Sequence, residues 1–250
     1  MTQPLILLEN MTKCYNEIRA VDNLSLSIPP GQVFAFLGPN GAGKTTTIKV
    51  LTGLLRPTEG RALIGGCDIQ EEPEKAKRLI GYIPDHPYVY EKLSGREFFH
   101  FIGDLFGVSE EEQNRKFEYY FDLFGLTPAA DKLVQNYSHG MRQKLVMSVS
   151  LMHDPKIIMV DEPMVGLDPQ SALVVKKLFQ ECADAGASVF LSTHTLSVAE
   201  EVADEIGLIN KGKLIFQGTL EDMRKKTKKS GNLEELFLEL TGREIVTSER

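Results

Sequence analysis

The sequence is poor in the features that mark secreted and membrane-spanning proteins. Its 250 residues include no tryptophan and only three cysteines, Cys14, Cys67 and Cys182. These cysteines are far apart and lack metal-ligand spacing, which predicts reduced thiols in a cytosolic protein. No apolar run approaches the roughly 18 residues needed to cross a bilayer. The segment Leu5–Leu8 is too short, and lacks the basic lead, for a signal peptide. If the protein serves a membrane, we expect it to do so from outside the lipid.

An excess of positive charge is also missing. The formal net charge is −7 at pH 7, so we expect no nucleic-acid partner, because nucleic-acid binders need a basic surface. A content of 42% hydrophobic and 25% charged residues is ordinary for a globular protein. The sequence contains neither an internal repeat nor a low-complexity segment. Its length fits one large domain or two small ones.

A glycine-rich stretch gives the strongest functional signal. It lies between the apolar run Val33–Leu37 and a helix expected from Thr45 to about Leu55, with the spacing Gly, four residues, Gly-Lys-Thr. Its N–H groups and the positive helix start predict phosphate binding, and a glycine-rich turn without a ligand is the alternative. Lys44 would reach the β- and γ-phosphates, and the Thr45 hydroxyl would contact Mg²⁺. The predicted nucleotide-binding residues in this stretch are Gly38, Pro39, Asn40, Gly41, Ala42, Gly43, Lys44, Thr45 and Thr46.

Two further apolar runs predict the rest of the core. Lys156–Val160 and Ser188–Ser192 lack polar alternation, as buried strands of a parallel sheet do. A helix is expected between them over Gln170–Ala185, so strand–helix units dominate and the fold class is α/β. The segment from Ile206 to Phe216 predicts a β-hairpin.

Polar side chains follow both of these runs. Asp161 and Glu162 close the first run, and strand ends beside a phosphate-binding loop are where this fold class places its metal and its water. Asp161 is therefore a candidate Mg²⁺ ligand, and Glu162 a candidate for polarising an attacking water molecule. His194, after the second run, can donate a hydrogen bond to a γ-phosphate. A structural histidine and an ordinary acidic loop start are the alternatives.

An aromatic-rich segment from Tyr82 to Tyr137 holds thirteen of the 20 aromatic residues. Ser94 with Glu97, and Ser109 with Glu112, have the spacing of capping boxes, so the segment predicts a small helical insertion. Most of its aromatic side chains are expected to fill its own core, with apolar positions at helical spacing. The remainder would form a docking surface, for which the candidates are Tyr88, Tyr90, Phe98 and Phe99.

Taken together and in order, these motifs resemble those of the ATP-binding subunits of ABC transporters. The resemblance covers the chain from Tyr15 to about Gly218 and is closest to subunits that serve ABC-2-type and related bacterial exporters. It implies a P-loop NTPase fold with a RecA-like parallel-sheet core, an antiparallel β subdomain and the helical insertion. The segments that carry it are Gly38–Thr46, Tyr137–Gln143, Ile157–Glu162, Gly166–Asp168 and Thr193–His194.

The resemblance also implies roles for individual residues. Lys44, Glu162 and His194 correspond to the catalytic groups, Thr45 and Asp161 to the metal site, and Tyr15 to the aromatic residue that stacks on adenine. From the residues alone, a loop tyrosine such as Tyr15 is more often half-buried packing. In the family, two subunits pair head to tail, and the signature segment of one caps the ATP of the other. Ser138 and Gly140 occupy that signature here, and Asp168 corresponds to the loop that couples the subunits.

This chain departs from the family pattern in two places. His139 and Met141 replace a glycine and a glutamine of the Leu-Ser-Gly-Gly-Gln signature, while Ser138 and Gly140 remain. Asp85 stands where the family usually has the glutamine that joins the metal site to the helical insertion, so we count Asp85 as a third candidate metal residue. The alternative is that Asp85 is a helix-capping or turn residue after Pro84.

The resemblance implies an enzyme that binds and hydrolyses ATP with Mg²⁺ and powers transport through a separate integral membrane permease. Its partners would be that permease and a second ATP-binding subunit, in a homodimer or a heterodimer on the cytoplasmic face of the membrane. An ABC ATPase that acts in assembly or remodelling is the alternative. We expect the ATPase domain over residues 1–222, with a helical subdomain inserted at about 85–153, and a basic, amphipathic tail over residues 223–250.

Overall fold

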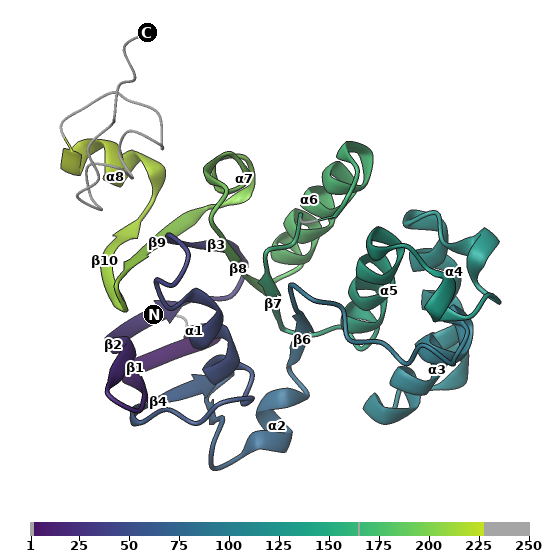
Figure 1. Ribbon diagram of the computed structural model, residues 1–250, viewed down its shortest axis with the longest axis horizontal. Coiled ribbons are helices and arrows are strands. Elements are labelled where there is room, and N and C mark those ends of the chain that lie inside the picture. The colour runs from purple at the N-terminus through teal and green to yellow at the C-terminus, as the bar shows by residue number, and fades with distance from the viewer. Residues whose placement is uncertain (1–2, 165, 228–250) are drawn as a thin grey trace, which may run out of the picture.

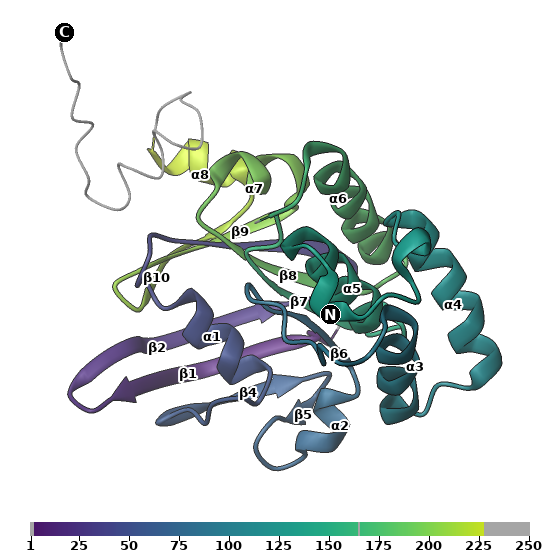
Figure 2. The ribbon, with the colours of Figure 1, turned by 45° about the vertical axis from the view of Figure 1, so that its right-hand side comes forward.

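The computed structural model describes residues 3–164 and 166–227, which form two β-sheets and a group of helices set to one side (Figures 1 and 2). Within these residues, one sheet has four strands in the order β2-β1-β4-β5, and the other has six in the order β10-β9-β3-β8-β7-β6. No helix in this part of the chain is long and apolar enough to span a membrane. The α/β class predicted from the strand–helix alternation is confirmed.

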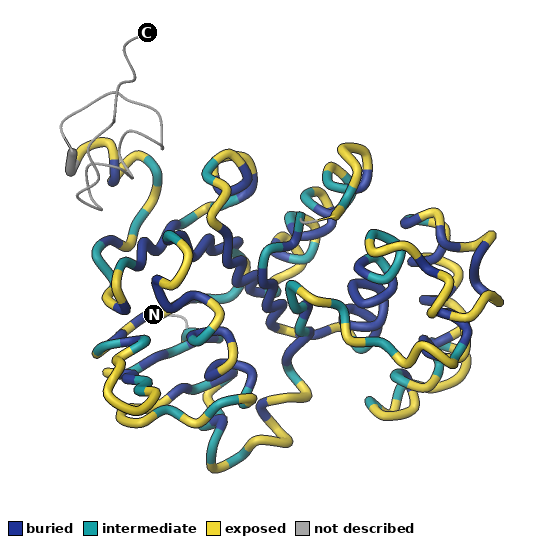
Figure 3. Tube along the Cα trace, viewed as in Figure 1, coloured by how far each residue is buried: buried dark blue, intermediate teal, exposed yellow. Residues whose placement is uncertain are grey.

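The six-stranded sheet forms the centre of the molecule. The five strands β3, β6, β7, β8 and β9 run parallel to one another, and β10 at the edge pairs antiparallel with β9. The runs predicted as buried strands, β3, β7 and β8, are buried almost throughout (Figure 3), because helices or the second sheet cover both faces. The strands are β3 (Gln32–Leu37), β6 (Ile80–Ile83), β7 (Ile157–Asp161), β8 (Ser188–Thr193), β9 (Glu205–Asn210) and β10 (Lys213–Gly218).

The antiparallel sheet has longer strands than the sequence indicated. Tyr15 is the last residue of β1 and pairs with Ile18 of β2, so it is a strand residue and not the loop tyrosine considered from the sequence. The exposed face of the sheet carries charged and polar residues, which weakened the apolar signal while cross-strand pairing extended the strands. The strands are β1 (Ile6–Tyr15), β2 (Ile18–Ile28), β4 (Glu59–Ile64) and β5 (Cys67–Asp68).

Helix α1 (Lys44–Leu51) follows the glycine-rich loop and packs between the two sheets, contacting β2 and β4 on one side and β7 and β8 on the other (Figure 2). It is shorter than predicted, because Gly53 adopts the left-handed conformation and ends it. A short helix, α2 (Pro73–Lys77), connects β5 to β6. Both sheets therefore contribute to holding α1 and the loop before it.

The predicted helical insertion is present as α3 (Gly95–Phe106), α4 (Glu110–Leu123) and α5 (His139–Leu151), joined through 3₁₀ turns at Thr127–Ala129 and Val134–Asn136 (Figure 1). Ser94 and Glu97 form the capping box of α3, and the Ser109 side chain caps α4. These local signals were readable because each depends on residues three positions apart.

The aromatic residues of the insertion mostly fill its core, as predicted. The buried ones are Phe98, Phe99, Phe117, Tyr120, Phe121, Phe124 and Tyr137. The expectation that Phe98 and Phe99 are exposed for docking is therefore wrong, because α3 turns that face onto α4 and α5. Tyr88 and Tyr90 are exposed, as predicted.

The remaining helices cover the central sheet. They are α6 (Pro169–Asp184), α7 (Leu196–Val202) and α8 (Leu220–Thr227). The predicted hairpin is formed by β9 and β10. Helix α8 crosses the boundary expected at residue 222, and Met223 is buried against the sheet, so the packed domain extends past that point. The rest of the predicted tail, from residue 228, lies outside the described residues.

Candidate functional site

The glycine-rich loop owes its glycines to close packing. A Cβ atom at Gly38 would lie 2.4 Å from the carbonyl oxygen of Ile209, and one at Gly43 would lie 2.6 Å from that of Ala20. Gly41 has open space around it but a φ of +77°, which favours glycine. The loop is thus clamped between β2 and β9. Its shape leaves the N–H groups at the start of α1 without a side-chain cap among the described residues, so they can receive an anion.

Lys44 is buried at the start of α1 and folds back over the loop. Its Nζ donates to the carbonyl oxygens of Gly38 at 2.7 Å and Pro39 at 3.3 Å. Burial lowers the pKa of the Lys44 ammonium, and the nearby carboxylates of Glu162 and Asp161 oppose that shift. This ammonium is the cation that faces the predicted acidic pair across the site.

Asp161 is the last residue of β7 and is buried. It lies beside Ser192 in the parallel ladder, and the Ser192 hydroxyl donates to Asp161 Oδ1. The strand ends here because Glu162 adopts a left-handed backbone conformation with a φ of +51°, which is uncommon outside glycine and asparagine. The two consecutive carboxylates have different surroundings: Asp161 is 3% exposed, whereas Glu162 lines the pocket described below.

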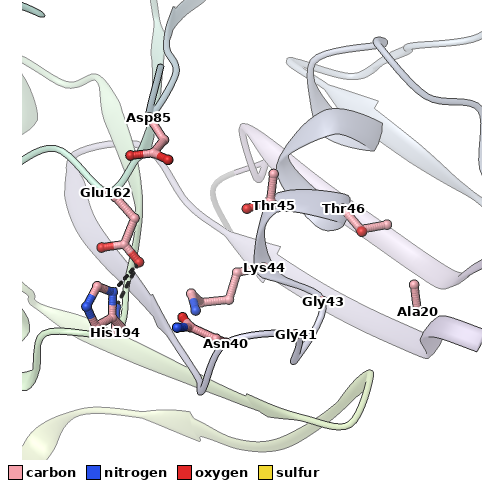
Figure 4. Close-up of a pocket in the computed structure, with 10 residues that line it drawn as sticks. All are labelled: Ala20, Asn40, Gly41, Gly43, Lys44, Thr45, Thr46, Asp85, Glu162 and His194. Carbon is pink, nitrogen blue, oxygen red and sulfur yellow. Dashed lines mark hydrogen bonds and ion pairs between the residues drawn. The ribbon is translucent and has the colours of Figure 1, made fainter. Parts of the chain in front are cut away.

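Glu162 is held by the end of β8. Its Oε2 accepts a hydrogen bond from Thr193 Oγ1 at 3.2 Å, and its Oε1 accepts one from the backbone N–H of His194 at 3.1 Å. The same oxygen lies 2.7 Å from His194 Nδ1 (Figure 4). The Glu162 side chain is only 16% exposed, whereas that of His194 is 52% exposed. The carboxylate is therefore fixed, while the imidazole faces the open side of the site.

A pocket of about 570 Å³ joins these groups to the loop. Lys44, Thr45 and Asn40 lie on one side of it, and Glu162 and His194 lie on the other (Figure 4). They meet because the carboxyl ends of parallel strands β3, β7 and β8 share one edge of the sheet. The lining residues are Ala20, Asn40, Gly41, Gly43, Lys44, Thr45, Thr46, Asp85, Glu162 and His194.

Asp85 belongs to this pocket, in the bend that follows β6. Its side chain points into the site above Glu162 (Figure 4) and its Oδ2 lies 3.0 Å from Nδ1 of His86. Helix α3 is capped by Ser94 instead, so the helix-capping interpretation of Asp85 is wrong. Among the described residues, no three carboxylate, histidine or cysteine side chains converge where they could hold a metal. Asp85, Asp161 and Glu162 therefore do not form one cluster.

Six predicted nucleotide-binding residues are not part of the pocket lining. Three belong to the glycine-rich loop itself, Gly38, Pro39 and Ala42, and three come from elsewhere in the chain, Tyr15, Ser138 and Gly140. The Tyr15 ring is 44% exposed, with Lys13 Nζ 5.4 Å from its centroid. Ser138 is an exposed cap of α5 and accepts a hydrogen bond from the Met141 N–H at 3.3 Å. The start of α5 therefore takes no part in the pocket lining of its own chain.

Gly140 packs against the segment before α6. A Cβ atom there would lie 2.8 Å from the carbonyl oxygen of Gly166. Asp168 caps α6, accepting from the Ser171 N–H at 2.8 Å and the Ser171 hydroxyl at 2.6 Å. These hydrogen bonds, with Lys144 nearby, lower the pKa of Asp168 to about 2. The signature segment and the Asp168 loop therefore form one continuous surface.

Sequence reasoning missed residues that shape the site. Ala20 lines the pocket from β2, while Ser192 and Thr193 bind the two carboxylates from β8. Two consecutive hydroxyl residues at the end of an otherwise apolar strand were the available signal. Their partners became clear only from the register of β7 and β8.

The arrangement can bind a polyphosphate and activate water. Backbone N–H groups and Lys44 supply positive potential for phosphate oxygens, and the Glu162 carboxylate can accept a hydrogen bond from water. The oxygen donors of Thr45 and Asp161 suit Mg²⁺, which commonly takes one or two protein ligands together with substrate phosphates.

The comparisons with known proteins agree with this geometry. The family described as ABC transporter matches residues 21–165. The daunorubicin/doxorubicin resistance ATP-binding protein DrrA of Streptomyces peucetius is 40% identical, over 89% of this chain and 68% of that relative. A structure described as an ATP-binding subunit of an ABC transporter matches with a TM-score of 0.91 and 31% identity, covering 95% of this chain and 99% of the other.

A further structure, described as a dimeric post-hydrolysis state of an ATP-binding cassette with bound ADP and Pi, matches with a TM-score of 0.76 and 25% identity. It covers 86% of this chain and 98% of the other. The chain belongs to the ABC transporter family, as an ATP-binding subunit that hydrolyses ATP to power transport.

Proposed function

We propose that this chain hydrolyses Mg²⁺-ATP in the pocket described above and drives a separate export permease. The observation that carries the proposal is the meeting of Lys44, Thr45, Glu162 and His194 in one pocket at the carboxyl ends of the central strands. The drug-resistance role named for the relative DrrA supports an exporter. The chain would work at the cytoplasmic face of the membrane, where ATP is available.

The roles follow from the chemistry of each group. Lys44 neutralises charge on the β- and γ-phosphates, and the loop N–H groups hold their oxygens. Glu162 orients and polarises the attacking water, since its carboxylate faces the pocket at a strand end. His194 donates to the γ-phosphate from the exposed side of its ring. Tyr15 stacks on the adenine from the neighbouring end of β1.

A magnesium ion would be held by Thr45 and Asp161, with Asp85 on the adjoining wall, together with phosphate oxygens. When bound, it would neutralise phosphate charge during phosphoryl transfer. The donors are hydroxyl and carboxylate oxygens, which are the ligands that this hard cation prefers.

The second subunit completes the site. Ser138 and Gly140 begin α5 on the surface, away from the pocket of their own chain. The positive end of that helix would cap the γ-phosphate of ATP bound to a partner subunit. The dimer described for the structural relative with ADP and Pi supports this assembly.

The permease would dock in a groove between the core and the helical insertion. This groove, about 650 Å³, has apolar walls that include Tyr82, Ile102 and Phe106, with Lys49 and Lys77 among its lining residues. Tyr88 contributes to it and is 82% exposed. Such a groove suits a short amphipathic helix with an acidic residue, because apolar anchors and lysines then both gain partners.

The test is ATP turnover by the full chain. Lys44→Ala removes the charge opposite the phosphates, and we expect turnover to fall below one hundredth of the wild-type rate. Glu162→Gln should retain ATP and accumulate as a closed dimer, measured by light scattering after size exclusion. Normal turnover in Lys44→Ala, or a monomeric Glu162→Gln variant at saturating ATP, would contradict the assignment.

Copurification tests the transport role. A tagged copy of the chain, expressed in its native host, should copurify with a polytopic membrane protein that stimulates its ATPase activity. Recovery of only a large non-membrane assembly would favour the alternative of an ATPase that acts in remodelling.

A further inference from the structure

We propose that Ser192 and Thr193, the last two residues of β8, are positioning residues that aim the two consecutive carboxylates of the site. Ser192 holds Asp161 for the metal, and Thr193 holds Glu162 for the attacking water. The inference rests on the proposed roles of these two carboxylates, and it adds a pair of hydroxyl groups that does not itself contact the substrate.

The register of the sheet makes the pairing specific. Asp161 lies opposite Ser192 in the parallel ladder between β7 and β8. The Glu162 N–H then donates to the Ser192 carbonyl at 3.0 Å, which extends the hydrogen bonding between the two strands by one residue beyond Asp161. Each acid therefore has its own hydroxyl partner on the neighbouring strand. Without both strands in this register, neither contact could form.

Thr193 has a donor and an acceptor role at once. Its hydroxyl donates to Glu162 Oε2 at 3.2 Å and accepts from the backbone N–H of Thr195 at 3.0 Å. Because the side chain is 2% exposed, competition from bulk water is small. The accepted bond fixes where the hydroxyl proton points, and that proton in turn fixes the rotamer of Glu162.

The backbone conformation of Glu162 explains why its side chain needs a positioning residue. A non-glycine residue with a φ of +51° is held by its surroundings. Its carboxylate is anchored at Oε2 by Thr193 and at Oε1 by His194. When the His194 ring turns toward a phosphate, the Thr193 hydroxyl at Oε2 and the backbone N–H of His194 at Oε1 are the contacts that keep the carboxylate aimed at the water.

Ser192 acts on the other acid. It is fully buried, and its hydroxyl donates to Asp161 Oδ1. Because Oδ1 is engaged by Ser192, Oδ2 is the oxygen that would face the metal. A carboxylate fixed in this way binds the ion without first losing rotamer freedom.

Three substitutions separate the two effects. Thr193→Val keeps the shape and removes the hydroxyl, and we expect kcat to fall about tenfold while KM for ATP stays within about twofold. Thr193→Ser restores the hydroxyl and should recover at least about half of kcat. Ser192→Ala should raise, about fivefold, the Mg²⁺ concentration that half-saturates binding of a fluorescent ADP analogue. Thr193→Val and Ser192→Ala are the matched controls for each other's measurement, since Thr193→Val should leave this Mg²⁺ dependence unchanged.

The outcomes discriminate between positioning and simple support of the fold. Wild-type kcat in Thr193→Val, or an equal loss in Thr193→Ser, would overturn the role of Thr193. Unchanged Mg²⁺ dependence in Ser192→Ala would overturn that of Ser192, and this binding readout needs no turnover. Glu162→Gln is measured alongside these variants. If Glu162→Gln hydrolyses ATP at the normal rate, the assigned role of Glu162 is wrong. That outcome is distinguishable from a failure of the positioning roles of Ser192 and Thr193.

Discussion

His153 lies where the core meets the helical insertion and predicts an acid-sensitive stability. Its Nε2 donates to the Ile80 carbonyl at 3.1 Å, and its ring stacks on Phe106 with 3.8 Å between centroids. The Nδ1 atom is buried with no hydrogen-bond partner in the described structure. A second proton would therefore sit on Nδ1 without an acceptor. Burial lowers the pKa of His153 to about 4, and Lys116 adds to the shift, while the hydrogen bond to Ile80 and the charge of Asp154 oppose it.

The sign and size of the effect follow from linkage. The unfolded chain, with an ordinary histidine pKa near 6.5, binds a proton at higher pH than the folded chain does. The contribution is therefore fully present above pH 6.5 and is lost as the pH falls toward 4. The full loss is about 3 kcal/mol, of which about 2 kcal/mol is lost between pH 7.5 and pH 5.

Urea unfolding at pH 7.5 and pH 5 tests this reasoning. The His153→Gln variant keeps an N–H for the Ile80 carbonyl and cannot titrate. We expect wild type to lose about 2 kcal/mol more of its free energy of unfolding than this variant over the same pH interval. His139→Gln, at an exposed histidine, is the control and should follow wild type. Equal losses in wild type and His153→Gln would refute the assignment of a buried neutral imidazole.

Three further predictions follow from the geometry. Gly38→Ala, whose Cβ would lie 2.4 Å from the Ile209 carbonyl oxygen, should displace the loop and weaken ADP binding at least about tenfold by calorimetry. Asp85→Gln should raise the Mg²⁺ concentration needed for half-maximal turnover, and an unchanged value would make Asp85 a turn residue only. Phe99→Ala should cost about 3–5 kcal/mol of unfolding free energy, whereas Tyr88→Ala should cost under about 0.5 kcal/mol and reduce only permease-stimulated ATPase activity. Equal destabilisation by the two aromatic replacements would contradict the burial difference.

The sequence did not separate the exposed aromatic side chains of the insertion from the buried ones. Helical spacing identified an amphipathic α3, and its capping box located the start of that helix. The same spacing could not say whether Phe98 and Phe99 contact a neighbouring helix of this chain or a partner protein. A helix face that packs inside the domain and one that binds a partner are equally apolar in sequence. Packing of α3 against α4 and α5 decided the matter.

The sequence by itself determined the phosphate-binding loop, the acidic pair at a strand end and the helix caps. Each depends on residues within a few positions of one another, so local spacing carries the chemistry. Tertiary structure alone decided which side chains meet across the sheet. Ser192 and Asp161, and Thr193 and Glu162, are each 31 residues apart in the chain. Only the parallel register of β7 and β8 brings those hydroxyl groups to the carboxylates, because strand pairing is set by the packing of the whole core.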